Sequence, residues 1–167
     1  MTKQEILLTT QTTLLLTGTG FAWYTVYVDI TTFYSIYGTL FKFADCTPAN
    51  PFTQACFYGA FAFLAGFIWS LRLLQSKVSD LLISQQHLLY LLAFGTVFAW
   101  SNFAYMTYSH YHATTNPFTC TVSAGGSLFT TPCFVGSVIF LLSLLASYAG
   151  YLTLRKVSST QASTTKE

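Results

Sequence analysis

Four long apolar stretches constrain the fold of this chain more than any other feature. They cover about residues 6–28, 52–74, 81–108 and 133–154, and Arg72 is the only Lys, Arg, Asp or Glu residue within them. A membrane-spanning helix needs roughly 20 mostly apolar residues, because the hydrocarbon core is about 30 Å thick and each residue rises about 1.5 Å. The sequence therefore predicts an all-α membrane protein with four transmembrane helices.

Composition supports the same class of protein. Hydrophobic residues make up 53% of the chain and charged residues 7%, whereas a soluble domain carries about 25% charged residues to keep its surface wetted. The formal net charge of +2 is too small to favour a nucleic-acid partner. The expected partners are therefore the lipid bilayer and other membrane protein subunits, or further copies of the chain.

The basic residues indicate how the chain is oriented in the membrane. All but Lys42 lie near the chain ends or flank the short connection between the second and third stretches, at Lys3, Arg72, Lys77, Arg155, Lys156 and Lys166. The positive-inside rule assigns these ends to the cytoplasm. Residues 29–55 and 109–132 are then outer loops of a plasma-membrane protein. Residues 1–157 are predicted to form one transmembrane domain, and the polar, low-complexity residues 158–167 a disordered cytoplasmic tail.

The sequence also contains an internal repeat with an offset of 77 residues. GTGFAW at residues 18–23 recurs as GTVFAW at residues 95–100. FTQACFYG at residues 52–59 recurs as FTTPCFVG at residues 129–136. Because both matches have the same offset without a gap, the chain is predicted to be a tandem duplication.

The unit of the predicted duplication is a helical hairpin. The two copies cover about residues 6–75 and 81–155. Both hairpins enter the membrane from the cytoplasm and return to it, so the copies are predicted to be related by a pseudo-twofold axis along the membrane normal. Glycines on the predicted spans allow the helices to approach closely.

All four cysteines, Cys46, Cys56, Cys120 and Cys133, fall in the predicted outer loops or at their edges. This distribution suits an oxidising compartment and suggests one structural disulfide per loop, Cys46 with Cys56 and Cys120 with Cys133, although four cysteines allow three pairings. Each disulfide closes a short loop and is expected to stabilise it by about 2–4 kcal/mol. Thiol–disulfide chemistry is the alternative interpretation of the same residues.

The layout of helices and cysteines resembles that of the DsbB and vitamin K epoxide reductase families, over most of the chain. The resemblance implies a membrane oxidoreductase that passes electrons from thiols to a quinone, with the four cysteines as catalytic residues. These families carry C-x-x-C at the outer start of a helix, where the helix N-terminus stabilises the thiolate. This chain has Gly59 and Gly136 in place of the second cysteine. The redox role is therefore the second hypothesis.

A metal site at the outer face is a further candidate. Asp29 follows the first apolar stretch, and His110 and His112 follow the third. Because the duplication pairs these two helices, the carboxylate and the two imidazoles are candidates for a copper or zinc site. The alternative is structural, with Asp29 capping the end of the helix or meeting Lys42.

The expected function follows from the aromatic outer loops and the short inventory of reactive residues. The chain has 16 Phe and 11 Tyr, and those of the outer loops form either an interfacial belt or a docking face for another membrane subunit or a lipophilic ligand. The first hypothesis is a non-catalytic structural or interaction subunit of a larger membrane complex. The alternatives are the quinone-linked oxidoreductase and a small transporter or metal-handling protein.

Overall fold

The computed structural model describes residues 3–43, 50–75, 78–112, 129 and 131–164, without the side chains of residues 3–4, 78–80, 109–111 and 157–164. The described residues form four α-helices and one 3-10 helix. In chain order these are α1 (Lys3–Tyr37), η1 (Pro51–Thr53), α2 (Ala55–Gln75), α3 (Val78–His112) and α4 (Pro132–Thr164).

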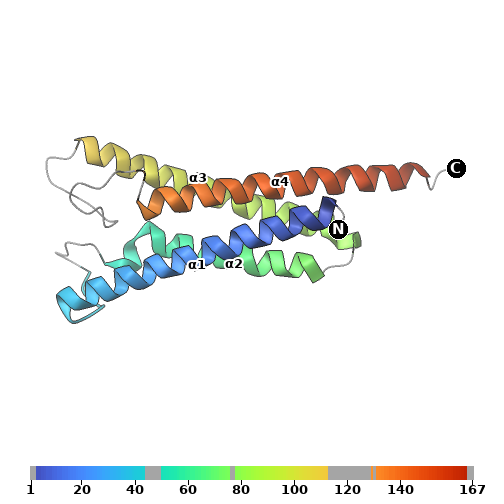
Figure 1. Cartoon of the computed structure of the whole chain (residues 1–167). Helices are drawn as coiled ribbons and strands as arrows, with labels where there is room; N and C mark the ends of the chain where they lie inside the picture. Colours follow the sequence, from blue (N-terminus) through green and yellow to red (C-terminus); the bar gives the residue numbers. More distant parts are fainter. Residues whose placement is uncertain (1–2, 44–49, 76–77, 113–128, 130, 165–167) are drawn as a thin grey trace.

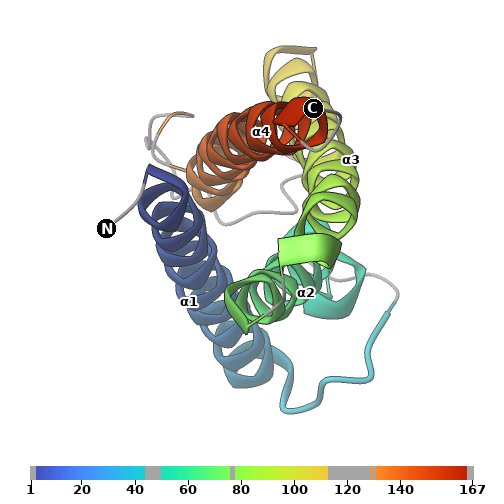
Figure 2. The ribbon, with the colours of Figure 1, turned by 90° about the vertical axis from the view of Figure 1, so that its right-hand side faces the viewer.

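The four helices run alternately up and down and form a ring (Figures 1 and 2). α1 packs against α2 and α4, and α3 packs against α4 and, less extensively, against α2. The two chain ends and the α2–α3 connection lie at one end of the bundle (Figure 1). The structure therefore confirms the all-α architecture of two helical hairpins with both termini at the same end.

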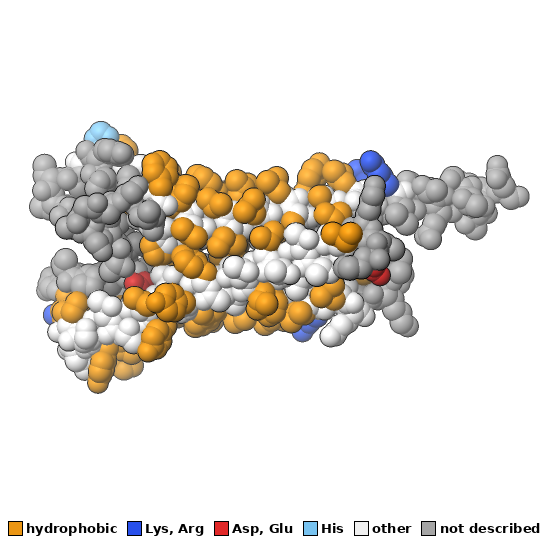
Figure 3. All heavy atoms as spheres, in the orientation of Figure 1, with side chains coloured by type: hydrophobic (Ala, Val, Ile, Leu, Met, Phe, Trp, Pro, Cys, Tyr) orange, Lys and Arg blue, Asp and Glu red, His pale blue; other side chains and the backbone are white. Residues whose placement is uncertain are grey.

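Three of the helices are long and apolar enough to cross a membrane, by their length and composition. These are Ala55–Gln75, Leu81–Tyr108 and Pro132–Lys156. On the face shown in Figure 3, apolar side chains cover the middle of the bundle, and the charged side chains lie towards its two ends. The chain therefore has the features of a multi-pass membrane protein, with three candidate spans instead of the four predicted.

The missing candidate is α1, which is less apolar because it is rich in threonine. Its threonine hydroxyls donate hydrogen bonds to the carbonyl four residues earlier in the same helix. Thr12 bonds to Leu8, and Thr19 bonds to Leu15. The same pattern occurs at Thr10, Thr13, Thr17, Thr25 and Thr31. These hydroxyls are therefore satisfied without water, which is the condition that a bilayer places on polar groups.

Three helices, α1, α3 and α4, extend further beyond the apolar stretches than predicted. α1 and α3 each have 35 residues, which corresponds to about 52 Å of helix and exceeds the hydrocarbon thickness of about 30 Å. α1 ends where Gly38 adopts a φ of 65° and its N–H bonds to the Tyr34 carbonyl at 2.8 Å, a common helix C-terminus. α4 continues to Thr164, so residues 158–164 are helical where the sequence predicted a disordered tail.

A buried polar cluster connects three helices in the half of the bundle near the chain ends. The Gln85 Nε2 atom donates to Gln11 Oε1 at 2.8 Å and to the hydroxyl and carbonyl oxygens of Ser147 at 3.0 and 3.1 Å. The three side chains are essentially inaccessible. Around them lies an apolar core from all four helices, which includes Leu15, Leu73, Leu88, Leu92 and Phe140. Polar contacts between helices are a common source of specificity in membrane bundles.

Candidate functional site

The centre of the bundle is closed by two phenylalanines from different hairpins. The rings of Phe63 on α2 and Phe140 on α4 stack with centroids 3.8 Å apart and an interplanar angle of 28°. Phe63 lies over Gly18 of its own hairpin, and Phe140 lies over Gly95 of the other. The two phenylalanines differ by 77 residues, and so do the two glycines. The same packing therefore occurs once in each hairpin.

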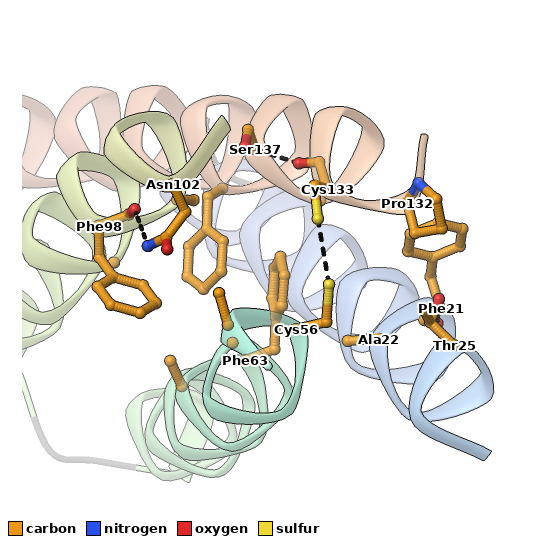
Figure 4. Close-up of a pocket in the computed structure, with 17 residues that line it drawn as sticks. Phe21, Ala22, Thr25, Cys56, Phe63, Phe98, Asn102, Pro132, Cys133 and Ser137 are labelled. Atoms are coloured by element: carbon orange, nitrogen blue, oxygen red, sulfur yellow. Dashed lines mark hydrogen bonds between the residues drawn. The ribbon is translucent and has the colours of Figure 1, made fainter. Parts of the chain in front are cut away.

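Two cysteines meet at the end of this interface that lies away from the chain ends (Figure 4). The Sγ atoms of Cys56 on α2 and Cys133 on α4 lie 3.2 Å apart and are separated by 77 residues. A covalent disulfide requires about 2.05 Å, so the two sulfurs are in contact without a bond between them. Both residues lie in the first turn of a helix, where backbone N–H groups favour negative charge.

A pocket of about 590 Å³, part of it open to the surroundings, lies beside these rings and cysteines. All four helices contribute to its wall. The lining includes seven pairs of residues that differ by 77, namely Phe21 with Phe98, Ala22 with Ala99, Thr25 with Asn102, Ala55 with Pro132, Cys56 with Cys133, Gly59 with Gly136, and Phe63 with Phe140. The pocket therefore lies between corresponding surfaces of the two hairpins.

The polar side chains in the pocket make hydrogen bonds to their own helices (Figure 4). Asn102 Nδ2 donates to the Phe98 carbonyl at 2.8 Å, and Ser137 Oγ donates to the Cys133 carbonyl at 2.7 Å. Thr25 Oγ1 donates to the Phe21 carbonyl at 3.0 Å. Each of the three side chains retains an oxygen that can accept a hydrogen bond. The pocket is thus apolar with a few uncharged acceptors near its outer end.

Two glycines in the pocket wall have no packing reason to be glycine. A Cβ atom built at Gly59 or Gly136 has no heavy atom within 4 Å, and neither residue has a positive φ. At Gly95, by contrast, a Cβ would lie 2.7 Å from the Phe140 ring. Gly59 and Gly136 therefore border open space, whereas Gly95 is required for close packing.

A groove continues from the pocket to the outside of the bundle between α2 and α3. It shares Ala55, Gly95 and Asn102 with the pocket wall, and Tyr58, Leu91 and Phe94 line its outer part. The groove lies where the contact between two neighbouring helices is least extensive. It opens along helices that are themselves candidate membrane spans.

Cys46 and Cys120 lie outside the described residues. The predicted pairing of Cys46 with Cys56 and of Cys120 with Cys133 therefore stays a prediction. Among the cysteines that the structure describes, no two are at bonding distance, and the contact that it shows joins the hairpins at Cys56 and Cys133.

The predicted metal site of Asp29, His110 and His112 stays a prediction, because the structure describes the side chains of Asp29 and His112 but not that of His110. No group of three His, Cys, Asp or Glu residues there lies close enough to hold a metal. The His112 ring packs on Tyr108 with centroids 4.4 Å apart, and the side chain of His110 is outside the described set. Asp29 lies within α1, which continues to Tyr37, so its predicted role as a helix cap is wrong.

The sequence analysis missed Thr25, Asn102 and Ser137 as pocket residues. Their types carry no signal, because polar side chains on an apolar helix are usually bonded within that helix. The 77-residue offset was the available signal, since it relates Cys56 to Cys133 and Phe63 to Phe140. In both pairs, residues at equivalent positions of the two hairpins contact each other.

No family model, no characterised protein and no solved structure matches the chain.

Proposed function

We propose that this chain is an integral membrane protein of four spans, built from two copies of one helical hairpin. The support is the agreement between sequence offset and packing: pairs of residues 77 apart stack at Phe63 and Phe140 and touch at Cys56 and Cys133. The phenylalanine–glycine packing within each hairpin repeats at the same offset.

The fourth span in this proposal is α1. It packs along both α2 and α4, so two of the three apolar spans would lose their neighbour if it lay outside the membrane. Its threonine hydroxyls bond within the helix, which lowers the cost of placing them in hydrocarbon. Both termini then lie on the cytoplasmic side with Arg72, Arg155 and Lys156, in accordance with the positive-inside rule.

The proposed function is that of a structural or interaction subunit of a membrane assembly. The observation that carries it is the exposure of large aromatic side chains at the outer end of the bundle, beyond the start of α2 and α4. Phe41 is 83% exposed, and Tyr34 and Phe43 are also exposed. Apolar patches outside the hydrocarbon region mark sites of protein association.

A photoreactive amino acid at position 41 tests this proposal. In intact membranes we expect irradiation to link the protein at this position to a protein of defined mass, because Phe41 lies at the outer end of the bundle. The same residue at position 94 is the control, since Phe94 lies in the lipid-facing groove. Labelling of lipid alone at position 41 would contradict the interaction role.

Thiol–disulfide exchange is a second candidate, favoured by the 3.2 Å contact of Cys56 and Cys133. The two thiols come from different hairpins. In this candidate they take the role of the C-x-x-C pair that the sequence lacks. In this candidate a Cys56–Cys133 disulfide accepts two electrons and two protons from a substrate dithiol, which becomes a disulfide. The reduced thiols of Cys56 and Cys133 then pass two electrons and two protons to a membrane quinone, which becomes a hydroquinone.

A redox titration against glutathione distinguishes the two candidates. The expected result for the structural role is a cysteine pair that resists reduction, with a potential below about −300 mV. A cysteine pair with a potential near that of the surrounding thiol pool would favour exchange. Cys133→Ser should then remove this redox transition. Transport along the axis has less support, because the stacked Phe63 and Phe140 rings fill the centre of the bundle.

A further inference from the structure

We infer that the pocket between the hairpins binds a membrane lipid with a rigid apolar body and a single hydroxyl group, which is the chemistry of a sterol. The inference rests on the proposed membrane placement, but not on the proposed interaction role. Its evidence is the open space at two glycines, the kind of polar atoms in the pocket and the groove that leads to the bilayer.

The glycines show that the pocket wall leaves room for a ligand. Glycine is unfavourable in the interior of a helix, and at Gly18 and Gly95 a phenylalanine ring requires it. At Gly59 and Gly136 a Cβ would meet nothing within 4 Å. Gly59 and Gly136 both line the pocket. A larger side chain at either position would enter the empty volume.

The polar atoms of the pocket indicate which kind of lipid head group it can bind. The lining residues that the structure describes are all uncharged, so a phosphate, carboxylate or metal ion would find no opposite charge. Thr25, Asn102 and Ser137 instead offer oxygens after donating to their own helices. These oxygens lie in the outer half of the bundle, near the first turns of α2 and α4. A hydroxyl donor at the membrane interface matches both their chemistry and their depth.

The groove between α2 and α3 provides the route of entry and a place for the body of the lipid. It extends along α3 from Asn102 to Leu91, which is 11 residues or about 16 Å of helix. Phe94 and Phe98 present flat rings in it, and Ala62 and Gly95 present little side chain. Flat and smooth walls fit a fused-ring body. Because both helices are candidate spans, the groove opens towards lipid.

Photolabelling of the full-length protein in phosphatidylcholine vesicles with a photoreactive sterol tests the inference. We expect label on the peptides that contain Phe98 and Cys133, and loss of that label when unlabelled sterol is added. Gly59→Leu and Gly136→Leu should lower the pocket label by at least about tenfold. Gly20→Leu is the matched control, since Gly20 also faces open space but lies outside the pocket wall.

A second measurement separates loss of binding from loss of the fold. Asn102→Leu should reduce the preference for the sterol over its methyl ether by about twofold to tenfold, the effect of one hydrogen bond. Equal labelling of the pocket by photoreactive phosphatidylcholine would overturn the inference. So would a sterol label spread evenly over exposed positions outside the pocket and the groove, such as Leu145. If no lipid probe labels α2, α3 or α4, the membrane placement itself is wrong.

Discussion

Single glycines decide how closely the helices of each hairpin approach. A Cβ at Gly95 would lie 2.7 Å from the Phe140 ring, and this ring is 3% exposed and stacked on Phe63. The ring cannot move away without losing its stack. Gly95→Ala is therefore expected to lower the free energy of unfolding by about 1–3 kcal/mol, measured by denaturant titration in detergent micelles.

The control for this prediction is Gly20→Ala. A Cβ at Gly20 has no neighbour within 4 Å, so this variant should be at least as stable as the parent chain, because alanine favours a helix more than glycine does. A double variant, Gly95→Ala with Phe140→Leu, should recover part of the stability lost by Gly95→Ala alone, because the shorter side chain makes room. Equal stability of Gly95→Ala and Gly20→Ala would show that the close approach is absent.

The buried glutamines give a second prediction at the residue scale. Gln85 supplies the hydrogen bonds that hold Gln11 and Ser147 together. Gln85→Leu should destabilise the protein by about 1–2 kcal/mol, because it leaves the buried Gln11 oxygen without its donor. Gln86→Leu is the surface control, since Gln86 bonds only to Tyr90 four residues away among the contacts described. An equal effect of both variants would mean that the cluster contributes no specific stability.

At the scale of the helices, the sequence predicts most of the architecture. Apolar runs of the required length with few charges identify α2, α3 and α4 directly. The helix ends are harder to predict, because α1 continues nine residues past Val28 through threonines and aromatics that favour strands as much as helices. Its end is set by Gly38, whose positive φ suits the helix terminus.

The prediction at the scale of the helices concerns whether α1 crosses the membrane. If α1 crosses the membrane, the chain has four spans and both termini lie on the cytoplasmic side. Epitope tags at residues 1 and 167 should then show the same protection from protease in sealed vesicles. Opposite accessibility of the two tags would indicate three spans, with α1 outside the hydrocarbon region.

For the whole molecule, the repeat predicts more of the site than any single motif. An offset of 77 residues is readable in the sequence, and it relates both cysteines and both stacked phenylalanines. The sequence could not show that related residues meet, because the distance between the hairpins depends on packing across the axis. The predicted pairing of each cysteine within its own loop stays a prediction, and the described contact joins the first turns of α2 and α4.

The central claim, that the two hairpins meet at Cys56 and Cys133, can be tested by a covalent trap. In a chain with Cys46→Ser and Cys120→Ser and a protease site inserted at residues 76–77, mild oxidation is followed by cleavage. The 3.2 Å contact of the two sulfurs predicts that the halves stay linked on a non-reducing gel and separate after reduction. A third substitution, Cys133→Ser, should abolish the link. Halves that separate without reductant, although the chain is folded, would contradict the account.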